Sequence, residues 1–282
     1  MASPISESSA TNDELAEAIK LRAKYTHFRI LVIGRANAGK TTVLKRVCNT
    51  DEEPCIYDED GKNLVRHHLS GMSQSANLTF AAGSDGGALQ RGIHDVHRPF
   101  SFKSNPEFIF HDSPGFEKGG AGELEKVRAF IADRAKARDV MDQIHAIWFC
   151  FYPDVSRPLL QLEQDFFNEQ RAGNVPVVAI FTKFDDLVSQ VWDRDKDYDA
   201  NENKARATLS ERFEYPLRKC NFPPRAYLHL EALNDDEGNH QEQVGVLIEK
   251  TAASIDNLAL KMLFVNVQQN NLEVCIRAAV NK

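Results

Sequence analysis

The chain has 282 residues, of which 42% are apolar and 27% charged, and its formal net charge is −7. This length is enough for one large α/β domain or two small ones, and the acidic balance argues against binding nucleic acid through charge alone. No segment approaches the run of about 18 apolar residues that predicts a membrane span, and five scattered cysteines without a CxxC pair favour the reduced thiols of a cytoplasmic protein.

Residues 1–24 are polar and then helix-prone, which predicts a flexible N-terminal arm. From residue 25 onward, short runs rich in Val, Ile, Phe or Trp alternate with stretches of amphipathic helical spacing. The runs predict buried strands at Phe28–Ile33, Glu107–His111, Ile144–Phe151, Val175–Phe181 and Ala226–Leu230. The stretches predict helices at Lys40–Cys48, Glu123–Arg138, Leu160–Gln170 and Asn203–Arg218. Strands that are apolar on both faces and separated by helices predict an α/β fold, a doubly wound, mostly parallel sheet with helices on both faces.

Other segments depart from this alternation. Val96–Phe102 predicts an edge strand that is antiparallel to Glu107–His111. The polar stretches 51–91 and Leu187–Ala200 predict a long mobile loop and a solvated excursion before a helix. Val244–Val280 predicts C-terminal helical structure that packs on the domain or on a partner helix. The predicted division is an arm over 1–24, one domain over 25–246 and a C-terminal helix over 247–282.

The segment from Gly34 to Thr41 is a complete GxxxxGK(S/T) P-loop, between a predicted strand and a predicted helix. Gly34 and Gly39 let the backbone turn tightly and approach phosphate, and the following amides and helix N-terminus form an anion nest. Lys40 can reach the β- and γ-phosphates, and the Thr41 hydroxyl can bind Mg²⁺. The predicted nucleotide-binding residues here are Gly34, Asn37, Ala38, Gly39, Lys40, Thr41 and Thr42.

Two further motifs narrow the choice of nucleotide. Asp112 ends a predicted strand, where its carboxylate can hold the water shell of Mg²⁺, and Gly115 can offer its amide to the γ-phosphate. Thr182-Lys183-Phe184-Asp185 directly follows the strand Val175–Phe181. The Asp185 carboxylate can accept both the N1 hydrogen and the exocyclic amine of guanine, a donor pair that adenine does not offer. The Lys183 stem can lie over the base, so the motif favours guanine.

With these motifs in this order, residues 25–246 resemble the TRAFAC class of P-loop GTPases. The run from Asn37 to Lys40 and the Asp-x-Pro-Gly of the second motif look like the Era/TrmE-like, septin and immune-associated branches. The stretches Arg91–Asp95 and Phe110–Leu124 also look like G-domain proteins of basidiomycete fungi. The resemblance implies GTP or GDP with Mg²⁺, metal ligands Thr41 and Asp112, and catalytic roles for Lys40, Thr41 and Gly115. It also implies that the Ala232 amide contacts the guanine carbonyl, although the family usually has Ser, Thr or Cys where this chain has Glu231.

The sequence departs from the family pattern in the groups that support hydrolysis. Thr79 lies too far upstream for the usual switch I threonine, and Ser84 is a substitute candidate. Phe116 stands where Ras-like enzymes have a water-orienting Gln, which leaves Glu117 or His111 as candidates. We therefore expect slow turnover without a partner or a nucleotide-dependent homodimer. Asn37 matches the position that helps hold K⁺ in the Era/TrmE-like branch, which makes K⁺ a candidate cofactor.

The sequence predicts Mg²⁺-dependent hydrolysis of GTP to GDP with a nucleotide-controlled switch loop. One alternative is a GTP-gated binding module with little hydrolysis, which would order the loop around 70–94 to recruit a protein effector that the sequence does not identify. A second alternative is a P-loop ATPase or kinase, for which Asp185 would be a coincidence.

Overall fold

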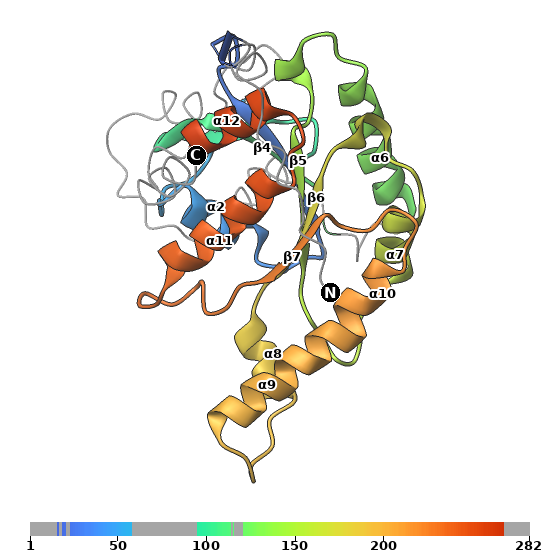
Figure 1. Cartoon of the computed structure of the whole chain (residues 1–282), viewed down its shortest axis with the longest axis vertical. Coiled ribbons are helices and arrows are strands. Elements are labelled where there is room, and N and C mark those ends of the chain that lie inside the picture. Colours follow the sequence, from blue (N-terminus) through green and yellow to red (C-terminus); the bar gives the residue numbers. More distant parts are fainter. Residues whose placement is uncertain are drawn as a thin grey trace, which may run out of the picture.

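The computed structural model describes residues 23–57, 95–113, 115 and 121–267, together with 16, 19 and 20. Within these ranges a single sheet runs through the molecule (Figure 1). Its strands are β1 (Phe28–Gly34), β2 (Cys55–Ile56), β3 (Phe100–Phe102), β4 (Asn105–Asp112), β5 (Ala146–Phe151), β6 (Val177–Phe181) and β7 (Ala226–His229). They lie in the order β2-β3-β4-β1-β5-β6-β7. The strands from β4 to β7 in this order are parallel, whereas β2 and β3 pair antiparallel at one edge.

Helices cover both faces of the sheet, which Figure 1 shows nearly edge-on. One face carries α2 (Lys40–Val47), α11 (His240–Ala253) and α12 (Leu258–Asn266). The other carries α6 (Ala121–Ala135), α7 (Gln161–Asn168), α8 (Phe184–Gln190), α9 (Tyr198–Leu209) and α10 (Tyr215–Arg218). A π-helical turn at Ser210–Glu214 joins α9 to α10, and 3₁₀ turns lie at Val140–Asp142 and Ala172–Asn174. The predicted doubly wound α/β fold is confirmed.

The apolar runs of the central strands serve two separate cores, because successive side chains of a strand point to opposite faces. In β5, Trp148 is fully buried in the core beneath α11 and donates from its indole nitrogen to the Thr251 hydroxyl at 3.1 Å. Its neighbour Phe149 lies in the opposite core, with its ring centroid 5.2 Å from that of Phe166 on α7. A strand buried on both faces therefore reads as a continuous apolar run.

Four predictions about individual elements need correction. β3 pairs antiparallel with β4 as expected but is not the edge strand, because β2 lies outside it. β2 falls inside the stretch 51–91 that was predicted to be a loop, and only two residues form it. The predicted excursion at Leu187–Ala200 begins too early, since Leu187 and Val188 are buried within α8. The helix predicted from Asn203 starts earlier, at Tyr198, where the Asp197 side chain accepts from the Ala200 amide at 2.8 Å.

The C-terminal helical segment is broken into α11 and α12. Asn257 ends the break by accepting from the Leu260 amide at 3.0 Å, which caps α12. Leu247 and Ile248 of α11 and Phe264 of α12 pack in the same core as β1 and β5. The predicted boundary between residues 246 and 247 falls within α11.

Several predictions concern residues that the structure does not describe. They are the N-terminal arm, except for five of its residues (16, 19, 20, 23 and 24), and the loop around 70–94 with Thr79 and Ser84. Phe116, Glu117 and the segment 268–282 belong to the same group. Across the ranges given above, no helix is long and apolar enough to cross a membrane.

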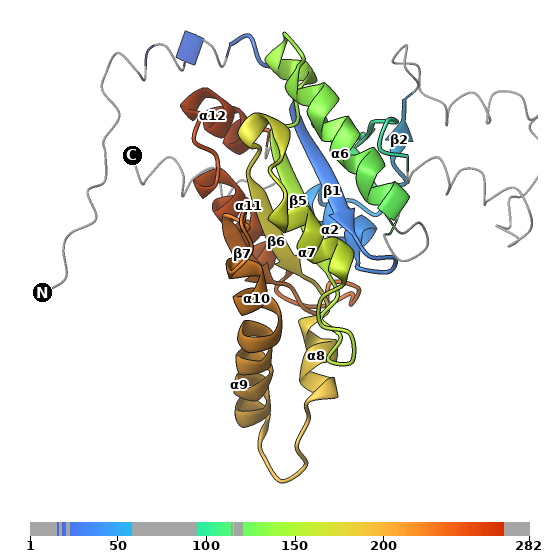
Figure 2. The same cartoon turned by 90° about the vertical axis from the view of Figure 1, so that its right-hand side faces the viewer.

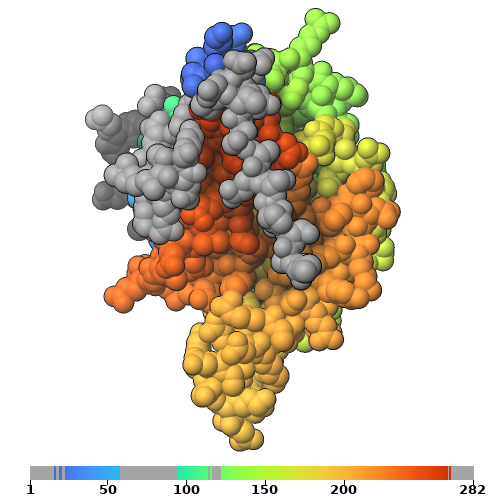
Figure 3. Space-filling view, in the orientation of Figure 1, coloured from blue at the N-terminus to red at the C-terminus, as the bar shows by residue number. Residues whose placement is uncertain are grey.

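Figures 1 and 2 show α8 and α9 standing out from the end of the sheet where β6 finishes, and Figure 3 shows this segment as a projection from the molecular surface. The carboxyl ends of the parallel strands lie at that end. In an α/β sheet, the crevice beyond the carboxyl ends, at the point where strand order reverses, is the usual place for a ligand. Here the order reverses at β1, because the chain builds the sheet to one side up to β4 and then crosses to β5.

Candidate functional site

The turn between β1 and α2 requires glycine at two positions. A Cβ at Gly34 would lie 2.3 Å from the carbonyl oxygen of Cys150, so β1 and β5 approach too closely there for any side chain. Gly39 has a φ of +66° and caps the N-terminus of α2 in the left-handed conformation. Asn37 also has a positive φ, of 60°, which Asn tolerates better than most residues. The backbone thus curls tightly immediately before the helix.

Lys40 places its ammonium group inside this turn. Its Nζ donates to the Arg35 carbonyl at 3.2 Å and lies 3.9 Å from Oδ1 of Asp112 at the end of β4. Only 7% of Lys40 and 1% of Asp112 is exposed, so the pair is shielded from solvent. Gly115 also meets the turn, since a Cβ there would lie 2.3 Å from the Ala36 amide nitrogen. The structure therefore brings the predicted P-loop and the Asp112–Gly115 motif together.

The donor set at this end is suited to phosphate and a hard cation. Thr41 exposes its side chain at the start of α2, and Asp112 supplies a carboxylate. Within the described ranges, no three His, Cys, Asp or Glu side chains gather as a metal site of their own. A Mg²⁺ ion held by one hydroxyl and one carboxylate would complete its shell with phosphate oxygens and water, which is how Mg²⁺ usually binds beside nucleotides.

A second part of the site follows β6. The Thr182 hydroxyl lies 3.1 Å from each of two carbonyl oxygens, of Ala38 in the P-loop and Phe151 at the end of β5, and so ties the three segments together. Lys183 has a φ of +54° at the N-cap of α8, and its Nζ lies 5.2 Å from the centroid of the Tyr152 ring. Burial, with a smaller contribution from the neighbouring Asp186, raises the pKa of Tyr152 above its ordinary value.

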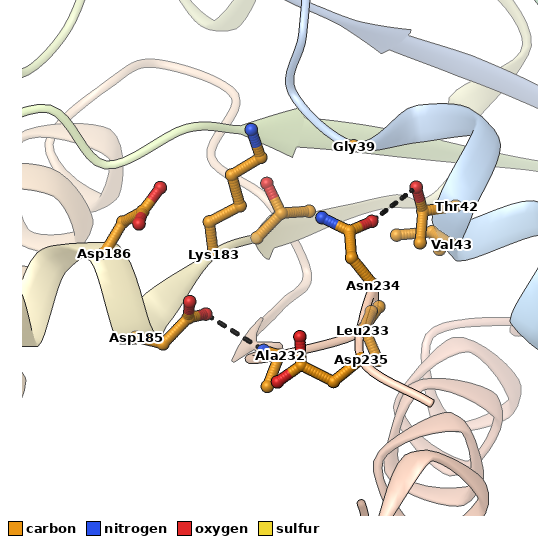
Figure 4. Close-up of a pocket in the computed structure, with 11 residues that line it drawn as sticks. Gly39, Thr42, Val43, Lys183, Asp185, Asp186, Ala232, Leu233, Asn234 and Asp235 are labelled. Atoms are coloured by element: carbon orange, nitrogen blue, oxygen red, sulfur yellow. Dashed lines mark hydrogen bonds between the residues drawn. The ribbon is translucent and has the colours of Figure 1, made fainter. Parts of the chain in front are cut away.

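Asp185 meets the loop that follows β7. Its Oδ1 accepts from the Ala232 amide at 2.9 Å. Both residues line a pocket of about 120 Å³, and Figure 4 shows the Lys183 and Asn234 side chains between Asp185 on one side and Thr42 of α2 on the other. The lining consists of Gly39, Thr42, Val43, Thr182, Lys183, Asp185, Asp186, Ala232, Leu233, Asn234 and Asp235. Asp185, Asp186 and Asp235 therefore lie around this pocket, whereas Lys40 lies in the P-loop beside Asp112.

The loop 231–235 is held by side chains that no sequence motif predicts. Gln243 on α11 accepts from the Glu231 amide at 2.8 Å and donates to the Glu231 carbonyl at 3.1 Å. Arg46 on α2 donates to the carbonyls of Leu233 and Asp235. Burial, with the nearby carboxylate of Glu202, raises the pKa of Glu231. No spacing pattern in the sequence relates Arg46 or Gln243 to this loop.

A buried ion pair beside the P-loop was also missed. Arg35 donates from Nε and Nη2 to the two carboxylate oxygens of Glu163 at 2.8 and 2.7 Å, and both residues are almost fully buried. The guanidinium also donates to the carbonyls of Arg157 and Pro158 at 3.0 and 3.2 Å. The pair fastens the P-loop to α7, and the two carbonyl contacts fasten it to the segment between β5 and α7. Its members are 128 positions apart, so no local signal could have found it.

His111 does not fit the water-orienting role for which its position in the sequence made it a candidate. The side chain is fully buried, with Nδ1 2.7 Å from the Val96 carbonyl and Nε2 3.1 Å from Nη1 of Arg29. Burial lowers the pKa of His111 to about 3, so the ring is neutral and both nitrogens are engaged in the interior. That leaves Glu117, outside the described residues, as the remaining candidate.

Comparison with known proteins shows likeness to solved structures only. No family model matches the sequence, and no curated protein matches it. In overall fold the chain is similar to Toc33 from Arabidopsis thaliana, whose crystal structure contains GDP and Mg²⁺, with a TM-score of 0.39 and 14% identity over 93% of each chain. A likeness of this size carries no weight for the site, whose interpretation rests on the chain's own residues.

Proposed function

We propose that this chain binds guanine nucleotides with Mg²⁺ and hydrolyses GTP to GDP. The observation that carries the proposal is the meeting of the Asp185 carboxylate and the Ala232 amide, 2.9 Å apart, in a pocket whose far wall is the P-loop helix. Guanine presents two hydrogen-bond donors and a neighbouring carbonyl acceptor. The Asp185 carboxylate can accept from the two donors, and the Ala232 amide can donate to the carbonyl. Lys40 and the P-loop amides lie at the other end of the site, as a polyphosphate requires.

The roles of the residues follow from their positions. Lys40 and the turn around Gly39 would hold the β- and γ-phosphates, and Thr41 and Asp112 would hold Mg²⁺, which neutralises phosphate charge when bound. Gly115 abuts the P-loop and would offer its amide to the γ-phosphate. A water molecule would attack the γ-phosphorus in line as the bond to the bridging oxygen breaks, with electrostatic stabilisation supplying most of the catalysis.

We further propose that unaided turnover is slow and that self-association or K⁺ bound near Asn37 raises it, as in the Era/TrmE-like GTPases that the sequence resembles. Phe116 in the place of a water-orienting Gln and the interior position of His111 support this. Turnover measured at fixed ionic strength in K⁺ and in Na⁺, at low and high protein concentration, is the test. A fast rate that is insensitive to both variables would contradict it.

The binding proposal is tested by displacing labelled GDP with GTP or ATP. We expect GTP to act at a concentration at least about tenfold lower than ATP, because adenine leaves Asp185 without its donors. Equal displacement would favour a P-loop ATPase or kinase instead.

The variant Asp185→Asn tests whether Asp185 contacts the guanine base. Asparagine keeps an oxygen that can accept from the Ala232 amide, but it replaces the second acceptor with a donor. Affinity for GDP should fall by about 5- to 150-fold, while xanthosine diphosphate, with a carbonyl in place of the guanine amine, should bind comparatively better. Asp186→Asn, next to it on α8, is the matched control. An unchanged preference for guanine over xanthine in Asp185→Asn would refute the assignment.

A GTP-gated binding module with little hydrolysis is the second candidate, and Phe116 is the observation that favours it. Such a module would use GTP to order a loop and recruit a protein effector. Single-turnover hydrolysis by the purified protein separates the two candidates, since the module would retain intact GTP.

A further inference from the structure

The loop 231–235 forms one wall of the pocket and is fastened there by α2. Arg46 lies one helical turn after Thr42, so both side chains leave the same side of the helix. Arg46 donates from Nε to the Leu233 carbonyl at 2.8 Å and from Nη2 to the Asp235 carbonyl at 2.7 Å. The Thr42 hydroxyl donates to Oδ1 of Asn234 at 3.2 Å. α2 therefore holds three successive residues of the loop, and all three line the pocket.

This loop contains a conformation that needs support. Ala232 has a φ of +47°, in the left-handed region that a residue with a Cβ adopts only at a cost in free energy. Such a conformation persists where the surrounding contacts fix it from both sides. Gln243 holds the preceding residue through two hydrogen bonds, and Arg46 holds the following ones. The supported conformation is the one that aims the Ala232 amide at Asp185.

Arg46 suits this task better than another cation would. A guanidinium offers several donors in a rigid planar fork, so one side chain can reach two carbonyl oxygens with charge-assisted hydrogen bonds. Fixing the Leu233 carbonyl also fixes the plane of the following peptide, because the peptide bond is planar. Arg46 is partly buried behind the loop and stands outside the pocket lining, so it acts through the loop and does not touch a ligand in the pocket.

We propose that Arg46 is a positioning residue for guanine recognition, which couples the base-binding loop to the helix that begins with the P-loop. The inference rests on the proposed function and deepens it. Because α2 carries Lys40 and Thr41 at one end and Arg46 at the other, the phosphate and base halves of the site share one rigid element. Without Arg46 the loop loses its attachment to α2 at two carbonyls, and the Ala232 amide is no longer held opposite Asp185.

The test uses the full chain with Arg46→Gln, Arg46→Lys and the control Lys45→Gln. Lys45 is the neighbouring residue on α2, but its Nζ bonds the Asp51 carbonyl and Glu53, at 3.2 and 2.9 Å, and not the loop. The control therefore removes the same charge from the same helix. Three quantities are measured: amide hydrogen exchange of residues 231–235 without nucleotide, dissociation constants for GDP, ADP and pyrophosphate, and the melting temperature.

In Arg46→Gln we expect exchange in the loop to accelerate by about tenfold and GDP affinity to fall by about tenfold, with pyrophosphate affinity changed by less than about twofold. The preference for GDP over ADP should fall with it. Arg46→Lys, which can reach one carbonyl at a time, should lie between Arg46→Gln and the wild type. Lys45→Gln should match the wild type in loop exchange and in its preference for GDP.

Equal losses of GDP and pyrophosphate affinity would overturn the proposal, because they would mean a general effect of charge or folding. Unchanged exchange in the loop would overturn it as well. Wild-type protein that binds GDP no better than ADP would refute the proposed function and the guanine part of this inference. Loop exchange would in that case still decide whether Arg46 fastens the loop.

Discussion

Replacing Glu163 with alanine should destabilise the fold by about 3–5 kcal/mol, because it leaves the Arg35 guanidinium buried without a carboxylate. Arg35 is 1% exposed and Glu163 is fully buried, so water has little access to replace the lost partner. The change removes two charge-assisted hydrogen bonds of 2.8 and 2.7 Å. It also leaves the Leu160 amide without the Glu163 oxygen to which it donates. In a domain of this size the loss corresponds to a fall in melting temperature of about 6–20 °C.

Urea unfolding of the wild type, Glu163→Ala, Glu163→Gln and the double variant Arg35→Met/Glu163→Met separates the possible causes. Glutamine keeps the shape and one acceptor, so it should cost less than alanine. The double variant should recover most of the stability, since apolar side chains can replace a buried ion pair. If Glu163→Ala and the double variant unfolded at the same urea concentration, an uncompensated charge would not be the cause. A loss below about 0.5 kcal/mol in Glu163→Ala would refute the reasoning outright.

Two further predictions concern the phosphate end and the opposite end of β1. Lys40→Ala should lose nucleotide binding at every Mg²⁺ concentration, whereas Thr41→Ala should regain part of its nucleotide binding as the Mg²⁺ concentration is raised. The test is a Mg²⁺ titration at fixed GTP, in which coincident curves for the two variants would show that one role is misassigned. His145 accepts from the Arg29 amide at 3.0 Å and donates to the Val140 carbonyl at 2.7 Å, and burial lowers its pKa to about 4. Since unfolded histidine titrates near pH 6.5, this stabilisation is present above about pH 6.5 and is lost as the pH falls toward 4, by up to about 3 kcal/mol. The difference in unfolding free energy between about pH 7.5 and pH 5 should therefore shrink in His145→Asn, and an unchanged difference would contradict the assignment.

The arrangement of the central sheet could be predicted because its strands carry apolar side chains on both faces. Residues such as Trp148 and Phe149 are adjacent in sequence yet bury into opposite cores, which is the pattern of a covered parallel strand. β2 could not be predicted, because a two-residue strand owes its existence to its pairing with β3 and not to its own sequence. The break between α11 and α12 contains neither Gly nor Pro, and its only local signal is Asn257, a favoured N-cap residue placed before an apolar run.

The same contrast holds within the candidate site. Gly34 and Gly39 could be predicted because their requirement is local: one approaches a neighbouring strand too closely for a Cβ, and the other has a left-handed backbone. Arg46 and Glu163, which hold parts of the site in place, could not be predicted, because each contacts residues that are distant in sequence and near only in the fold. A single sequence gives the motifs of the candidate site, whereas the side chains that hold these motifs in place depend on tertiary packing.

The central position of β1 has a consequence for how this protein folds during its synthesis on the ribosome. Its first partner, β4, pairs Phe28 with Phe108, and its second, β5, pairs Ile30 with Ala146, so the earliest strand made must wait for much of the chain before it is enclosed. Contacts between segments so far apart in sequence form slowly and leave apolar surface exposed in the meantime. The proposed base-binding half is completed later still, since Gln243 must be synthesised before it can hold Glu231. A nascent chain that has reached α7 but not β6 therefore has the P-loop without Asp185 or Ala232, the residues proposed to distinguish one base from another.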